Sequence, residues 1–285
     1  MTAPRIILSF GLCLIVCGTT ALAGAPMGPA MATLEPGQWS ISFEYAHENI
    51  NLAADGHSIE SIVGGSSERY SQSFAIDEME SDMFFGRLTY GLSETWDVFV
   101  RVGLSDAQDD LEVTGPGFIS GAGGQLGFDG SHGLAWGIGT RATFWSSGPW
   151  SIGGLAQVTW LDPDDSDFRI TVPGAPNQAV VGEGELDYLQ SQFNLALMYQ
   201  ENSWGVWAGP FVQLVDGDLD MDAQFVINGA TQGNLAFSGD LEEESMVGGH
   251  AGAACALSNS VACWVEGQFT ADSWLLGLGG IIRMK

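Results

Sequence analysis

The chain has 285 residues, with 8 Lys and Arg against 35 Asp and Glu, and a formal net charge of -27 at pH 7. Nucleic acid is an implausible partner for so acidic a protein, because binding phosphates requires clustered cations. The acids gather between apolar stretches that carry little charge themselves, whereas a soluble domain spreads charge over every element. The length allows one barrel or two small domains, and no Pro/Ser-rich linker divides it.

The N-terminus has the three parts of a secretory signal peptide. Arg5 supplies the positive charge, Ile6–Val16 is the apolar core, and Ala21-Leu22-Ala23 forms a small-x-small cleavage site before Gly24. The apolar core is too short for a membrane helix, and every later apolar run is interrupted within a few residues. We expect residues 1–23 to be removed on export and residues 24–36 to form a periplasmic segment.

Ten segments then alternate between apolar and polar residues, the pattern of half-exposed β-strands. Tight turns follow the second, fourth, sixth and eighth segments, and a very short connection follows the ninth. Long, acidic, Gly-rich connections follow the first, third, fifth and seventh. An even number of strands places both chain ends on the tight-turn side. The segments lie near residues 37–46, 82–91, 95–104, 133–145, 149–161, 187–200, 203–215, 246–257, 260–269 and 273–284.

Aromatic residues flank three of the tight turns, in Tyr90-Gly-Leu-Ser-Glu-Thr-Trp96, Phe144-Trp-Ser-Ser-Gly-Pro-Trp150 and Tyr199-Gln-Glu-Asn-Ser-Trp204. Apolar faces have aromatics at their ends, and polar faces carry Gln, Asn and Arg in mid-strand. A tilted run from Trp150 to Trp160 spans about 27 Å, close to the apolar band of a bilayer. The pattern predicts an all-β fold, an antiparallel up-and-down transmembrane β-barrel of about ten strands over residues 37–285.

In these features the chain resembles the small outer-membrane β-barrel proteins of diderm bacteria. The resemblance covers about residues 37–285 and concerns architecture, with no motif of one subfamily. It implies a cell outer-membrane location, contact with outer-membrane lipid, and long acidic loops on the extracellular side. Such proteins usually end in a strand with a terminal aromatic, whereas this chain ends Ile281-Ile-Arg-Met-Lys285.

Several charged residues have the parity of the inner face. A barrel of about ten strands is narrow, so charges inside it must pair. They either brace the barrel or line a gated path for a solute. His250 and Glu266 are candidates for an acid/base pair, although no nucleophile accompanies them. The predicted lumen set is Glu44, Arg87, Asp97, Arg101, Arg141, His250, Glu266 and Arg283.

Carboxylates continue the outward parity of three segments beyond their last apolar residues. They form either a solvated rim or a binding site for calcium, which favours several oxygen ligands and would bridge the rim to anionic lipid head groups. Asp-x-Asp-x-Asp lacks the Gly and terminal Glu of a calcium-binding loop. The predicted rim is Asp162, Asp164, Glu183, Glu185, Asp187, Asp216, Asp218 and Asp220.

Cys255 and Cys263 are equidistant from Asn259, so a hairpin centred there places them directly opposite each other. Directly opposed residues of a non-hydrogen-bonded pair are close enough for a disulfide. Export to an oxidising compartment favours that bond over two packed thiols.

Function is less constrained than fold. The sequence contains no Walker loop, Gly-x-Ser-x-Gly elbow or His-Glu-x-x-His motif. We expect a non-enzymatic barrel with structural and surface-binding or adhesive roles, its outer loops contacting an extracellular ligand. A porin-like channel for small solutes is the main alternative. Ten strands and acidic rims also resemble the omptin-type outer-membrane proteases, for which Asp129 and His132 are the candidate residues.

Overall fold

The computed structural model describes residues 24–114, 125–171, 175–243 and 246–284; the side chains of residues 77, 109–114, 125–129, 170–171 and 243 also lie outside this description. Within these ranges no helix is long and apolar enough to cross a bilayer. Twelve strands form one antiparallel sheet. Their bounds are β1 Trp39–Ile62, β2 Ser67–Ser93, β3 Trp96–Thr114, β4 Gln125–Ser147, β5 Trp150–Asp162, β6 Ser166–Thr171, β7 Gln178–Glu201, β8 Trp204–Ile227, β9 Ala230–Glu243, β10 Val247–Ala256, β11 Val261–Phe269 and β12 Trp274–Met284.

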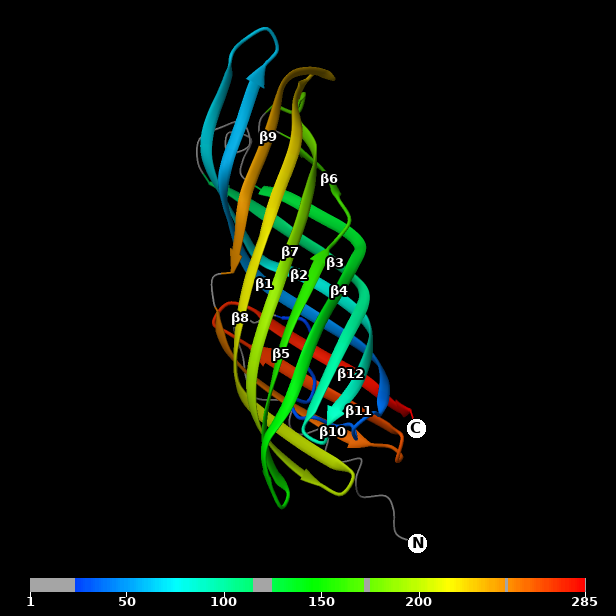
Figure 1. Cartoon of the computed structure of the whole chain (residues 1–285). Helices are drawn as coiled ribbons and strands as arrows, with labels where there is room; N and C mark the ends of the chain where they lie inside the picture. The colour runs from blue at the N-terminus through cyan, green and yellow to red at the C-terminus, as the bar shows by residue number, and fades with distance from the viewer. Residues whose placement is uncertain (1–23, 115–124, 172–174, 244–245, 285) are drawn as a thin grey trace.

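Ten of these strands close into a ring in the order β1-β2-β3-β4-β5-β7-β8-β10-β11-β12. β12 returns to pair with β1, from Trp39 opposite Met284 to Asn49 opposite Trp274. The start of β1 and the end of β12 therefore lie at one rim, the same rim that carries the tight turns (Figure 1). The predicted all-β, antiparallel barrel with ten spanning strands is confirmed.

The long connections are largely not loops, which corrects the sequence analysis. β1 and β2 continue far beyond the predicted segments and meet at a short turn after Ile62. β8 runs on to Ile227 and returns as β9 through the turn Asn228-Gly229, where both residues have positive φ. These stretches looked like loops because they are acidic and Gly-rich, but their side chains keep the period of two that defines a strand.

The parts of the strands beyond the membrane-level barrel form a second section of the barrel, called the extended section below. β9 makes the ring narrower there. It pairs with β8 beyond the residues that pair with β10, and with β1 beyond the residues that pair with β12. One strand thus stands where the membrane-level barrel has three, and β6 pairs with β7 on the other side. Figure 1 shows the two sections stacked along one axis. A narrower barrel leaves less interior to fill.

Side chains fill the interior of the extended section with an apolar core. Leu52, Phe74, Leu219, Met221 and Phe237 are each at most 2% exposed. Phe74 and Phe237 meet edge to face, with ring centroids 4.5 Å apart. This section resembles the inside of a soluble protein, with most of its acids turned outward to water and Glu60 buried as an exception.

The membrane-level section has the opposite polarity. Phe43 is 65% exposed on its outer face, and apolar side chains of β7 and β12 extend the same belt. Trp150, Tyr199 and Trp204 gather at the tight-turn level, with centroid distances of 4.9 and 5.7 Å. Trp136 and Trp160 stack 4.1 Å apart at the other edge of the belt. Two aromatic levels bounding an apolar belt are the expected contact with a bilayer.

Candidate functional site

Residues 24–36 form one segment, of which residues 24–34 occupy the lumen of the membrane-level barrel. In this lumen segment Ala25, Met27 and Ala30 are fully buried, and Leu34 is 4% exposed. Its C-terminal end lies at the tight-turn rim, where the Gly37 N–H donates to the carbonyl of Gly91 over 2.8 Å. The expected periplasmic placement is therefore wrong for residues 24–34, whereas Glu35 and Pro36 are exposed. The segment is small and uncharged up to Leu34, so a narrow lumen accepts it.

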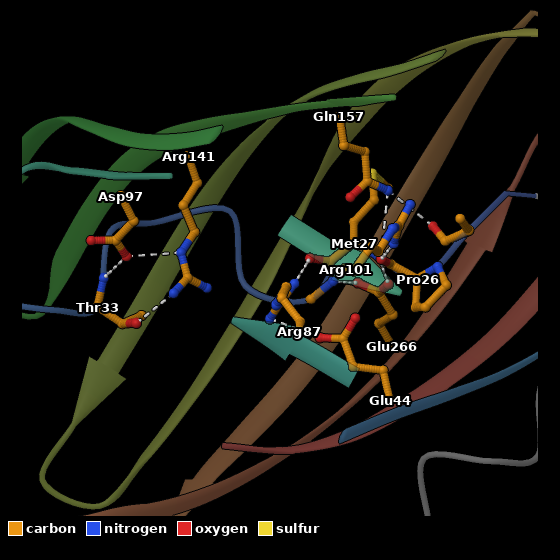
Figure 2. A network of polar contacts seen from close by, with 12 residues as sticks. Pro26, Met27, Thr33, Glu44, Arg87, Asp97, Arg101, Arg141, Gln157 and Glu266 are labelled. Atoms are coloured by element: carbon orange, nitrogen blue, oxygen red, sulfur yellow. Dashed lines mark hydrogen bonds and ion pairs between the residues drawn. The ribbon is translucent and has the colours of Figure 1, made fainter. Parts of the chain in front are cut away.

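Charged side chains hold the N-terminal half of the lumen segment (Figure 2). Glu266 accepts hydrogen bonds from the backbone N–H of Met27 at 2.6 Å and of Gly28 at 3.0 Å. Arg101 donates to the carbonyl of Pro26 at 2.9 Å, and Arg87 donates to the carbonyl of Met27 at 3.4 Å. Hydrogen bonds to ionised groups are stronger than neutral ones, so this half of the segment is firmly held.

A second set of hydrogen bonds holds the C-terminal half of the lumen segment, which lies nearer the tight turns. One carboxylate oxygen of Asp97 accepts from the Thr33 N–H at 2.8 Å and from Arg141 Nε at 2.9 Å. Arg141 also donates to the Thr33 hydroxyl at 2.7 Å, which closes a three-residue cycle (Figure 2). The Arg141 and Asp97 side chains are at most 1% exposed.

The structure places most of the predicted lumen set in this interior. Glu44 and Arg87 form an ion pair of 2.9 Å with both side chains fully buried. Arg283 is half-buried near the tight-turn rim. The buried members, each at most 4% exposed, are Glu44, Arg87, Asp97, Arg101, Arg141, His250 and Glu266.

The predicted approach of His250 to Glu266 is not seen. His250 lies opposite Gln268 in the ladder between β10 and β11, while Glu266 lies opposite Gly252. The two carboxylate oxygens of Glu266 bind the lumen segment instead. The geometry gives no acid/base pair at this position.

Sequence reasoning missed a cluster of glutamines at the inner end of the lumen segment. Ala25 donates its N–H to Gln190 at 2.6 Å, and its carbonyl accepts from Gln157 at 3.2 Å and Gln268 at 3.3 Å. Gln192 donates to Gln213 at 2.7 Å. A signal existed in the recurrence of Gln at inward parity in mid-strand. Long amides there need partners that the strands themselves do not supply.

All eight predicted rim carboxylates point outward and are exposed on the extended section. The ladders align them across strands: Asp187 lies opposite Asp218, Asp218 opposite Asp240, and Asp240 opposite Asp55. Like charges in direct opposition are unfavourable. This row across β7, β8, β9 and β1 is called the acidic face below, and it reaches two strands further than the sequence predicts.

Electrostatic crowding on the acidic face changes proton affinity. The pKa of Glu185 is raised, chiefly by the charge of Asp165. Partial burial and then the charge of Asp218 raise the pKa of Asp187. A groove of about 350 Å³ lies here, between these acids and the stacked Trp136 and Trp160. Among the described residues, no three His, Cys, Asp or Glu side chains form a group that could hold a metal ion. Calcium binding stays a prediction.

Comparisons with known proteins give structural similarities at low sequence identity. No family model matches the chain, and no curated protein matches it. Solved structures similar to it include the outer membrane protein OprG from Pseudomonas aeruginosa (11% identity, 88% of this chain and 97% of that chain, TM-score 0.46). The outer membrane protease OmpT from Escherichia coli (8%, 88% and 97%, 0.42) and the translocator domain of the autotransporter NalP from Neisseria meningitidis (12%, 88% and 90%, 0.40) are also similar.

The apolar belt around a closed, polar-lined ring decides the class. The protein is an outer-membrane β-barrel. From the usual arrangement of such barrels we expect its tight turns to face the periplasm and its acidic face to lie outside the cell. The signal peptide predicted at residues 1–23 lies outside the described residues and stays a prediction.

The two mature cysteines of this outer-membrane barrel are opposite each other in the ladder, as expected, but they are free thiols in the structure. Ala256 donates its N–H to the carbonyl of Ser203, the residue before β8, and Leu257 donates its N–H to the carbonyl of Val261. The alternation of the ladder then places the cysteines at a hydrogen-bonded pair, where side chains lie farther apart than the disulfide prediction assumed. Thiol labelling of the unfolded, unreduced protein decides whether the bond forms: full labelling of both shows that it is absent.

The candidate protease residues are not assembled into a site by the described contacts. His132 is about half exposed, and its Nδ1 lies 3.7 Å from a carboxylate oxygen of Asp106. The backbone of Asp129 is part of β4, and its side chain lies outside the described residues.

Proposed function

We propose that this protein is a non-enzymatic surface barrel with a closed lumen, which binds an extracellular partner through its extended section. The strongest support is that two different groups of residues fill the interior at two levels. Residues 24–34 occupy the membrane-level lumen, and an apolar core occupies the barrel above it. A solute has two obstacles of different chemistry to pass.

The acidic face gives the partner its chemistry. Carboxylates in register across four strands create a negative surface on a rigid sheet. On this face, a groove of about 900 Å³ has Asp55, Asp220 and Asp240 on its walls, with Arg69 and small residues such as Gly239 also in its lining. A surface of this kind favours a cationic partner and accelerates its approach at low salt.

Planar bilayers test the closed lumen. We expect the purified full-length mature chain to give no reproducible single-channel conductance. Steady conductance from the intact chain would refute the proposal and favour the channel. A chain that lacks residues 24–34 is the matched comparison, because it empties the membrane-level lumen and leaves the apolar core in place.

Binding of a cationic peptide such as oligolysine tests the acidic face. We expect a Kd that rises with salt and that rises further when Asp218 and Asp240 are changed to Asn together. The matched control changes two exposed acids at the periplasmic turns, Glu94 and Glu201, to Gln. Equal weakening by both sets of changes would show only a general effect of net charge and would refute a specific surface.

A small-solute channel remains the second candidate for one reason. The described hydrogen bonds to residues 25–33 all involve a barrel side chain, as at Glu266 and Asp97, so no ladder has to break when the segment leaves. The protease alternative has its own test, the cleavage of a peptide library. Cleavage that is lost in Asp129→Ala or His132→Ala would support it.

A further inference from the structure

Among the described residues, one carboxylate in the lumen has no cation beside it. Glu48, on β1, is fully buried. It accepts from Gln190 at 3.3 Å and from the backbone nitrogen of Gly24, and its other oxygen has no hydrogen-bond partner among the described residues. The ion pairs between described residues do not include it. A buried carboxylate without a counter-charge is costly, so a partner is to be expected.

Gly24 lies at the inner end of the lumen segment, against this carboxylate. A Cβ atom at this position would collide with the side-chain ends of Gln192 and Gln213, so these amides would have to shift to admit a larger residue. The next residue, Ala25, packs into the apolar core that caps the lumen. The segment therefore enters from the periplasmic rim and reaches its deepest point at Gly24.

The sequence singles out the same residue independently. Ala21-Leu22-Ala23 places the predicted cleavage between Ala23 and Gly24. Hydrolysis of that peptide bond consumes one water, leaves a carboxylate on Ala23 and frees the amine of Gly24. An α-amino group has a pKa of about 8, so it takes up a proton and becomes an ammonium at neutral pH.

We propose that cleavage after Ala23 creates the missing cation, and that the Gly24 α-ammonium is buried in the lumen as an ion pair with Glu48. The ammonium has three donors, and the carboxylate together with the amide oxygens of Gln213 and Gln268 supplies acceptors around Gly24. Processing would thus control assembly, because only the cleaved chain carries the charge that fixes the lumen segment. The inference holds whether the barrel is closed or gated.

The chain offers a clean measurement, because Lys285 is its only lysine. The processed protein then has two primary amines, those of Gly24 and Lys285. We expect terminal sequencing of the protein from outer membranes to begin at Gly24. An amine-selective reagent should modify Gly24 at least about tenfold more slowly in the folded barrel than in urea, as read by mass spectrometry of the N-terminal peptide. A different mature terminus, or equal rates in the two states, would overturn the proposal.

Charge removal from either side tests the pair itself. Chains that start at Gly24 are refolded with a free or an acetylated amine, each with and without Glu48→Gln. We expect each single change to lower the melting temperature and the combination to add little more, since both remove one interaction. Glu35→Gln is the matched control, an exposed acid at the other end of the same segment, and should change nothing. Fully additive losses would contradict the ion pair, and if Glu48→Gln does not refold, the labelling rates of the unaltered chain still decide.

Discussion

The Asp97–Arg141 pair offers the sharpest test of how the lumen is held. Both side chains are at most 1% exposed, and Asp97 also accepts the Thr33 N–H of the lumen segment. Asp97→Asn keeps the shape but leaves the Arg141 guanidinium buried without its counter-charge. Breaking a buried pair from one side costs about 3–5 kcal/mol, so we expect a loss of that size in the free energy of unfolding.

Replacing both partners should cost much less. Asp97→Leu with Arg141→Met removes the two charges together, and such replacements are often close to neutral. Urea unfolding of the refolded barrel, followed by tryptophan fluorescence, supplies the four free energies of a double-mutant cycle. We expect a coupling energy of at least about 2 kcal/mol. Single losses below about 1 kcal/mol that simply add would show a hydrated pair like those on a protein surface, and would refute the dry, filled lumen.

Three further predictions concern the extended section. Calcium at millimolar concentration should raise the melting temperature, and Asp216→Asn with Asp218→Asn should reduce the gain; equal melting temperatures in calcium and chelator at matched ionic strength would leave only a solvated rim. The pKa values of Glu185 and Asp187 are raised in the folded state. At pH values between the ordinary and the raised pKa, the folded state therefore binds more protons than the unfolded state. Stability should therefore fall as pH rises through the window just above the ordinary carboxyl pKa, and thermal melts in which Asp187→Asn leaves that slope unchanged would contradict this. Phe237→Ala should cost about 3–5 kcal/mol in urea unfolding, and a loss below about 1 kcal/mol would disprove a packed upper core.

The membrane-level strands were predictable because lipid imposes one rule on every outward position. Along β8, Trp204, Val206 and Leu214 are outward and apolar, and the alternation alone gives the strand and its face. Beyond Leu214 the rule reverses. Asp216 and its outward successors alternate with the buried Leu219 and with other inward residues, so the strand continues while its polarity inverts. Because the outward residues beyond Leu214 are not apolar, the sequence pattern predicts a loop there.

The lumen segment was not predictable for a different reason. It has no periodicity, and its anchors are remote in sequence: Met27 and Glu266 are 239 residues apart. The predicted lumen charges did indicate that further partners were needed, because inward arginines and acids require hydrogen-bond or ion-pair partners. They did not reveal that the partners are backbone groups of the chain's own N-terminal segment. Only the closed ring brings Asp97, Arg101 and Glu266 around one path.

The two sections seal the interior with unequal strength, and this bears on the channel alternative. Emptying the membrane-level lumen exposes polar and charged groups that water solvates readily. Opening the extended section exposes large apolar side chains, each worth about 1.5–3 kcal/mol when buried. Six of them, Leu52, Phe74, Ile76, Leu219, Met221 and Phe237, come to roughly 9–18 kcal/mol, as much as the whole stability of a typical domain. The upper core therefore decides closure, and a chain without residues 24–34 should still fail to conduct. Conductance that appears on this deletion alone would mean that the core opens far more easily than its packing implies, and would shift the balance to a gated channel.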